Sequence, residues 1–177
     1  MQLPSFVLLG LAATSVSAID AYYHLGQNCD GNAIVCSNLN PGVCCSDGRS
    51  LANTIGYRGI PTNWVIAARG YGGNQCGDTS TVREVAQNTN FLCLKNRFGT
   101  PLGATRYAFG ANSKRRDDFS GSEVTESSEC QKPDQLVLAD GVTKYDIAGL
   151  DDDVVDELLK LASEGTAIPA AFHSLKL

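Results

Sequence analysis

Seven cysteines constrain the fold of this chain more than any other feature of its sequence. Six of them precede a dibasic segment, Lys114-Arg115-Arg116, and the seventh, Cys130, follows it. Disulfides persist outside the cell and are rare in the cytosol, so closely spaced cysteines indicate an extracellular chain with covalent cross-links. An odd number leaves at least one thiol unpaired within the chain. We therefore expect three disulfides among Cys29, Cys36, Cys44, Cys45, Cys76 and Cys93.

The pairing of these cysteines stays open, because sequence alone cannot choose among the possible connectivities. Cys44 and Cys45 are adjacent and should reach different partners, since a bond between them would strain the intervening peptide. Cys130 is then the free thiol, or a site for intermolecular pairing. The alternative is a long-range bond to Cys130 that leaves one of the first six cysteines free.

Residues 1–18 predict a signal peptide. The segment Phe6–Ala13 is apolar, and Val16-Ser17-Ala18 fits a signal-peptidase cut before Ile19. The apolar stretch is about half the roughly 20 residues that a membrane-spanning helix needs. We expect the mature chain to be secreted into the extracellular space.

We expect residues 19–177 to form a single secreted domain with three parts. A basic, cysteine-rich part covers residues 19–110, a mobile polar loop covers 111–133, and an acidic hairpin plus helix covers 134–177. The whole chain has a net charge of −5, which argues against nucleic acid or an anionic membrane as the partner. Either the basic and acidic parts attract each other within one fold, or cleavage after Arg116 releases a basic domain from an acidic segment.

Two short apolar runs and one segment that alternates with period two, all between glycine- or proline-containing turns, predict strands rather than helices. They are Trp64–Ala68, Phe91–Leu94 and Thr105–Phe109. The cysteine-dense stretch Cys29–Cys45 is interrupted by glycine and proline, and it predicts a loop-rich start to the domain.

The last part of the chain predicts a hairpin and a helix. Leu136–Ala139 and Val142–Ile147 flank Asp140-Gly141, a dipeptide that suits a two-residue type I′ turn. The helix is expected over Asp152–Ser163, with the acidic run Asp151–Asp153 capping its first turn and Gly165 ending it. The predicted fold class is therefore mainly β (α+β): a compact, disulfide-stapled sandwich or barrel with one C-terminal helix.

No catalytic residues are predicted, and we expect no enzyme activity. A cysteine nucleophile needs a base close in space, usually histidine. The two histidines, His24 and His173, lie near the two ends of the mature chain and are interpreted as ordinary surface residues. Consecutive carboxylates at Asp151–Asp153 would point about 100° apart on a helix and cannot converge on calcium. We expect no metal and no cofactor.

The overall layout resembles the small secreted cysteine-rich proteins of filamentous fungi, a group that includes effectors released into plant tissue. Two fragments are similar to cysteine-protease inhibitors. Gly70-Tyr71-Gly72-Gly73 matches the Gly-x-Gly-Gly loop of chagasin-type inhibitors, and Gln135–Ala139 is similar to the cystatin pattern Gln-x-Val-x-Gly, departing at Ala139. The resemblance implies a virulence-type effector that binds and inhibits a host extracellular papain-like cysteine protease.

The residues proposed for protease contact lie around these two fragments. They are Trp64, Arg69, Gly70, Tyr71, Gly72, Gly73, Gln135 and Val137. Tryptophan, tyrosine and arginine are enriched among the residues that dominate binding energy at interfaces. One alternative is a basic antimicrobial or killer-toxin-like domain released by dibasic cleavage at Arg116. The other is a small secreted hydrolase with an unrecognised site.

Overall fold

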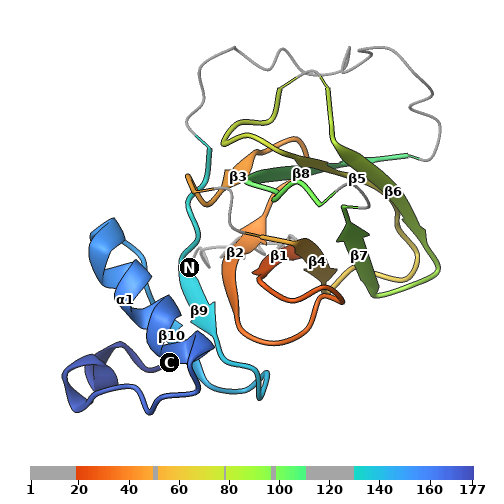
Figure 1. Ribbon diagram of the computed structural model, residues 1–177. Coiled ribbons are helices and arrows are strands. Elements are labelled where there is room, and N and C mark those ends of the chain that lie inside the picture. Colours follow the sequence, from red (N-terminus) through yellow and green to blue (C-terminus); the bar gives the residue numbers. More distant parts are fainter. Residues whose placement is uncertain (1–18, 50–51, 78, 97–98, 111–129) are drawn as a thin grey trace, which may run out of the picture.

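Figure 1 shows a computed structural model of the protein, which describes residues 19–49, 52–77, 79–96, 99–110 and 130–177. Two antiparallel sheets make up most of it, and a C-terminal helix lies beside one of them. One sheet has six strands in the order β10-β9-β2-β1-β4-β7, and the other has four in the order β3-β8-β5-β6. The predicted fold class, mainly β with disulfides and one C-terminal α-helix, is confirmed.

The strands are β1 (Ile19–His24), β2 (Ala33–Leu39), β3 (Cys45–Ser46), β4 (Thr54–Arg58), β5 (Val65–Tyr71), β6 (Val82–Gln87), β7 (Phe91–Lys95), β8 (Ala104–Phe109), β9 (Gln135–Val137) and β10 (Lys144–Asp146). The helices are α1 (Asp152–Ser163) and a short 3-10 helix, η1 (Ala170–Leu175). The three strands predicted at Trp64–Ala68, Phe91–Leu94 and Thr105–Phe109 correspond to β5, β7 and β8.

Two strands at the start of the domain were not predicted. β1 lies in the middle of the six-stranded sheet, between β2 and β4. β2 occupies half of the stretch interpreted as loop-rich, so that interpretation is wrong for residues 33–39. The apolar residues Ala33, Ile34 and Val35 begin β2 and pair with both β1 and β9, and pairing with β1 alone extends the strand through Cys36 to Leu39.

Buried side chains of the two sheets meet in one core. Tyr57 from β4 and Tyr107 from β8 are both fully buried, and their rings lie edge to face with centroids 6.0 Å apart. Each hydroxyl has a partner: the Tyr57 hydroxyl lies 2.7 Å from Thr105 Oγ1, and the Tyr107 hydroxyl donates to the Leu39 carbonyl at 3.0 Å. Burial raises the pKa of Tyr57 and raises the pKa of Tyr107 to about 12. These pairs connect the sheets through the core.

The helix α1 has the bounds predicted from the sequence. Its inner face buries Val155, Leu158, Leu159 and Ala162 against the core of the sheets. The expected side-chain cap is absent, because Asp151 makes no capping hydrogen bond and only its backbone carbonyl accepts from the first turn. The helix is therefore held by its apolar face, with the first-turn carboxylates favourably placed at the positive end of its dipole.

The predicted hairpin exists, but its turn is longer than the sequence suggested. β9 and β10 pair with Val137 opposite Lys144, so the connection is not a two-residue turn. A type I′ turn needs positive φ at both central residues, and here Gly141 has a φ of 70° whereas Asp140 does not share that conformation. Instead, the Asp140 carboxylate accepts hydrogen bonds from the amides of Val142 and Thr143 and closes a wider loop.

The polar segment 111–133 lies largely outside the described residues, and so does the processing candidate Arg116. Its last residues, 130–133, are described, and only Lys132 among them is exposed. Gln131 forms a parallel bridge with Cys45, so this part of the segment runs along β3.

Removing the apolar anchor of α1 tests how the helix is held. Leu158 is fully buried, so Leu158→Ala is expected to lower the free energy of unfolding by about 3 kcal/mol, as in other buried leucine truncations. Leu161 lies on the same helix but is only half-buried, and Leu161→Ala is the matched control, with an expected loss of about 1 kcal/mol or less. Chemical denaturation of both variants measures the difference. Equal losses would show that the inner face of α1 does not anchor the helix.

Candidate functional site: a cysteine-lined groove and a tethered loop

Three disulfides cross-link the described part of the chain. Cys29 pairs with Cys93, Cys36 with Cys45, and Cys44 with Cys76. Their Cα separations of 5.9, 6.3 and 5.8 Å are ordinary for disulfides. The adjacent cysteines thus have different partners, and the three bonds use the six cysteines that precede the dibasic segment.

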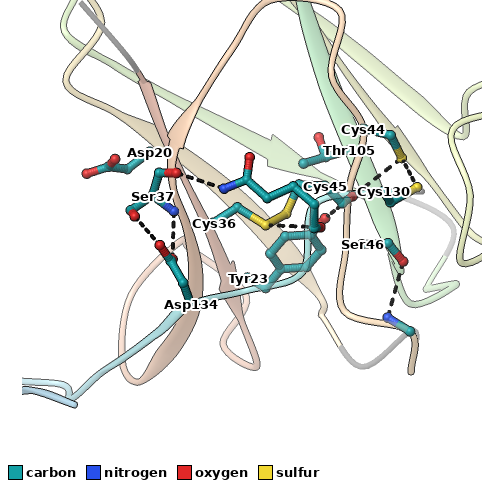
Figure 2. Close-up of a disulfide and its surroundings, with 12 residues drawn as sticks. Asp20, Tyr23, Cys36, Ser37, Cys44, Cys45, Ser46, Thr105, Cys130 and Asp134 are labelled. Carbon is teal, nitrogen blue, oxygen red and sulfur yellow. Dashed lines mark hydrogen bonds between the residues drawn. A yellow bond between two sulfur atoms is a disulfide. The ribbon is translucent and has the colours of Figure 1, made fainter. Parts of the chain in front are cut away.

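Cys130 is the free cysteine, and it lies against one of these disulfides. Figure 2 shows Cys130 beside Cys44, and the two Sγ atoms are 2.7 Å apart. Cys44 is itself bonded to Cys76. The Cys130 side chain is half-buried rather than freely exposed as its sequence context suggested. Three sulfur atoms from distant parts of the chain therefore form one cluster, which we call the sulfur cluster (Cys44, Cys76 and Cys130).

The residue that follows Cys130 holds it in place. The Gln131 amide donates to the Cys44 carbonyl at 2.7 Å, and the Gln131 carbonyl accepts from the Ser46 amide at 3.0 Å. The Gln131 side-chain amide also donates to the Ser37 carbonyl at 2.8 Å. Cys130 is therefore positioned by backbone pairing on β3 and by a contact to β2.

A groove of about 680 Å³ opens beside the sulfur cluster, between the turn that follows β3 and the start of α1. Its lining mixes charges of both signs with apolar side chains: Ser46, Asp47, Gly48, Arg49, Asn74, Gln75, Cys130, Lys132, Pro133, Ile147, Gly149, Leu150, Asp152 and Val155. Arg49 crosses from the β3 turn to α1, where its guanidinium pairs with Asp156. The titratable groups among its lining residues are the Cys130 thiol, the carboxylates of Asp47 and Asp152, and the cations of Arg49 and Lys132.

The described residues include no cluster of three or more histidine, cysteine, aspartate or glutamate side chains that could hold a metal ion.

An exposed loop, Gly72–Gln75, forms one rim of the groove, and we call it the tethered loop. Gly73, Asn74 and Gln75 are exposed, and the next residue, Cys76, carries the disulfide to Cys44. The Asn74 side chain donates to the Gly48 carbonyl at 2.6 Å, and the Asn74 carbonyl accepts from the Ser46 hydroxyl at 2.7 Å (Figure 2 shows Ser46 beside the cluster). One covalent bond and two hydrogen bonds thus restrict a short exposed segment.

The structure divides the predicted glycine-rich contact motif. Gly70 and Tyr71 belong to β5, and Tyr71 is only 2% exposed, so neither is available as a loop contact. A Cβ atom on Gly70 would lie 2.9 Å from Val82 Cγ1, which explains the glycine by close packing between β5 and β6. Gly72 and Gly73 remain as the accessible part of the motif.

Trp64 and Arg69 do not join the tethered loop. Trp64 precedes β5 and packs on Phe109 with ring centroids 4.7 Å apart, so the whole strand separates it from Gly72, more than about 20 Å. Arg69 is in register with Arg83 on one side and Arg106 on the other, which places three arginines in a row across the four-stranded sheet.

The first three residues of the cystatin-like fragment form a strand of the six-stranded sheet, and the last residue, Ala139, is exposed. Gln135 and Val137 lie in β9, which pairs with β2 along one edge and with β10 along the other. Val137 is 4% exposed. The Val137 side chain therefore packs within the fold, and Gln135 is half-buried; the contact role stays a prediction for both residues.

His24 is buried in β1, which corrects the surface assignment, whereas His173 in η1 is exposed. Neither ring nitrogen of His24 has a hydrogen-bond partner among the described residues. Burial lowers the pKa of His24 below its usual range, and the Arg58 guanidinium lowers it further. The imidazole ring of His24 packs beside Gly56: a Cβ atom added to Gly56 would lie 3.5 Å from His24 Nε2.

Comparisons with known proteins cover most of the chain. The family model ARB_05566_N, described as an N-terminal domain, matches residues 20–134, a segment that contains all three disulfides and Cys130 and stops before β9. The chain is also similar to a protein of Arthroderma benhamiae named "Uncharacterized secreted protein", with 26% identity over 175 residues that cover 93% of this chain and 88% of the relative. No solved structure matches. Among the described residues, no helix has the length and apolar character needed to cross a membrane.

The buried His24 makes the stability of the fold depend on pH. Its folded pKa lies below the unfolded value of about 6.5, so the unfolded chain takes up a proton that the folded chain excludes. The contribution of His24 to the free energy of unfolding is fully present above about pH 6.5 and is lost as the pH falls below that value. Denaturant midpoints at pH 7.5 and 5.5 measure the loss. We expect His24→Leu to reduce the change in stability between the two pH values and the exposed control His173→Leu to keep the wild-type change. The same change in His24→Leu as in the wild type would contradict this account.

Proposed function

The chain belongs to the ARB_05566_N family, and on that premise we propose that its disulfide-bonded β domain is a binding module rather than an enzyme. The protein is secreted, as three disulfides and its similarity to a secreted fungal protein indicate. The proposal rests chiefly on one observation, the tethered loop at the rim of the groove. A secreted partner would be contacted by this loop and by the adjoining groove.

The tethering of the loop reduces the cost of binding. An exposed loop that is free in solution must be ordered when it binds, and each immobilised side chain costs about 0.5–1.5 kcal/mol. Here Cys76 is covalently fixed to Cys44, and Asn74 is bonded to the turn after β3 in the unbound protein. Most of the ordering is therefore complete before a partner arrives.

We propose a secreted papain-like cysteine protease as the partner, and a virulence-type effector as the role. The layout of the chain supports this choice, together with two consecutive glycines that let the loop backbone approach a narrow cleft. Gly73 in particular presents only backbone, with open space around the position of a Cβ atom. The net charge of −5 supports a protein partner over nucleic acid or an anionic membrane.

The alternative of a basic toxin released by dibasic cleavage finds no support in the fold. Strand β9 pairs with β2, and Leu136 in β9 and Leu158 in α1 are fully buried in the common core. A fragment that ended at Arg116 would lose both elements and expose the apolar surface they cover. A small secreted hydrolase would need a general base, and the carboxylates of Asp47 and Asp152 are the groups in the described groove that could act as one.

A substitution at Gly73 tests the proposed contact without disturbing the fold. A Cβ atom there meets nothing within 4 Å, whereas at Gly72 it would press on Thr81 Oγ1 at 3.3 Å. We expect the wild-type protein to inhibit at least one member of a papain-like protease panel and Gly73→Val to raise the inhibition constant at least tenfold. Gly77→Val is the matched control, because that glycine lies beyond Cys76 and also has open space around it.

Two outcomes would contradict the proposal at different levels. Full protease activity at a large excess of wild-type protein removes papain-like proteases as the partner. Inhibition that survives Gly73→Val moves the contact away from the tethered loop, and the hairpin tip, where Val142 is 80% exposed, becomes the next surface to mutate.

A further inference from the structure

We propose that the sulfur cluster is a thiol–disulfide exchange site in which Cys44 alternates between Cys76 and Cys130 as its bonded partner. The inference does not depend on the identity of any binding partner. Cys130 is not an isolated thiol, because its Sγ lies 2.7 Å from one sulfur of an existing disulfide. Thiolate attack on a neighbouring disulfide sulfur is the elementary step of disulfide exchange.

The fold brings the thiol to this position. Cys44 precedes β3 directly, and Gln131 pairs with the backbone on both sides of Cys45. Cys130 therefore stands beside Cys44 because of hydrogen bonds that do not involve the sulfur atoms. Farther along, the Asp134 carboxylate binds the amide and hydroxyl of Ser37, which fixes the same segment to β2 (Figure 2).

The exchange step balances within the chain. The Cys130 thiol loses its proton to water, and the thiolate attacks Sγ of Cys44. A Cys130–Cys44 bond forms as the Cys44–Cys76 bond breaks, and Cys76 leaves as a thiolate that takes up a proton. No electrons are gained or lost, so the step needs no oxidant or reductant. One disulfide and one thiol are present before and after the step.

The two pairings have different mechanical effects. Bonding to Cys76 tethers the exposed loop, whereas bonding to Cys130 would tether the segment that already lies along β3. After exchange the loop would keep only noncovalent links, such as the Asn74 bond to the Gly48 carbonyl. The buried Cys36–Cys45 bond joins β2 to β3 and takes no part in the exchange, so the two sheets stay covalently linked in both states.

The released Cys76 thiol would lie at the surface. Cys76 is half-buried and is flanked by exposed residues on both sides. It could then attack an external disulfide, forming a mixed disulfide and releasing the other half as a thiol. The chemical class of ligand for this site is therefore a small extracellular disulfide, for which oxidised glutathione is the probe.

The first test removes the native partner of Cys44. In Cys76→Ser we expect Cys44 to bond to Cys130, so that the folded, air-oxidised protein has no free thiol and loses the single thiol of the wild type. Cys93→Ser is the matched control, because Cys29 has no such neighbour and two free thiols, Cys29 and Cys130, are expected. Maleimide labelling and non-reducing peptide mapping report both. Labels on both Cys44 and Cys130 in Cys76→Ser would overturn the proposal.

The second test uses the wild-type chain and so does not depend on the folding of a variant. After prolonged incubation with oxidised glutathione, we expect the glutathione adduct on Cys76 as well as on Cys130, with a Cys44–Cys130 bond in the molecules modified at Cys76. Cys130→Ser, which lacks the attacking thiol, is expected to form no adduct. An adduct confined to Cys130 in the wild type would show that no exchange occurs. An adduct on Cys76 in Cys130→Ser would show that Cys76 is released without Cys130, and either result would overturn the proposal.

Discussion

The buried Cys36–Cys45 disulfide is the bond on which the rest of the structure depends. It joins β2 of the six-stranded sheet to β3 of the four-stranded sheet, and both cysteines are fully buried. The Cys45 carbonyl accepts a hydrogen bond from the Tyr23 hydroxyl at 2.7 Å, so β1 is connected to the same point. The two cysteines of this disulfide are separated by only 9 residues in the sequence, compared with 64 for Cys29–Cys93. A disulfide that closes a shorter loop lowers the entropy of the unfolded chain less and so stabilises the fold less. Its importance therefore lies in where it places β3, because the groove, the sulfur cluster and the tethered loop are all built around that short strand.

Charge contributes less to this arrangement than the sequence suggested. The basic and acidic parts of the chain do meet, at the ion pair between Arg49 and Asp156, but the Asp156 side chain is 54% exposed. Exposed pairs are typically worth about 0–1 kcal/mol. The buried face of α1, with Leu158 fully enclosed, accounts for more of the attachment.

Hydrophobic patterns in the sequence predicted those strands and helices whose pattern is complete within a few consecutive residues. The short segments that became β5, β7 and β8 and the amphipathic helix α1 are of this kind. β2 was missed because Ser37 and Asn38 interrupt its apolar pattern, and the second half of the strand takes its conformation from pairing with β1. The proximity of Cys130 to Cys44 had no local signal at all, because it follows from backbone pairing between residues far apart in the chain. The glycine motif was divided for the same reason: β5 continues through Gly70 and Tyr71 because β6 and β8 pair with it there.

The position of β9 has a consequence for how the protein is made. β1 pairs with β2 and β4, which are synthesised soon after it. The other edge of β2 pairs with β9, so it stays unpaired until residues 135–137 have been synthesised. Until those residues emerge, the apolar edge at Ala33, Ile34 and Val35 is an open template for pairing with another chain. Pairing between such distant segments is slow, because the loop between them must close before its contacts form. The nascent domain therefore passes through a stage with an unprotected sheet edge, and completion of the C-terminal part ends that exposure.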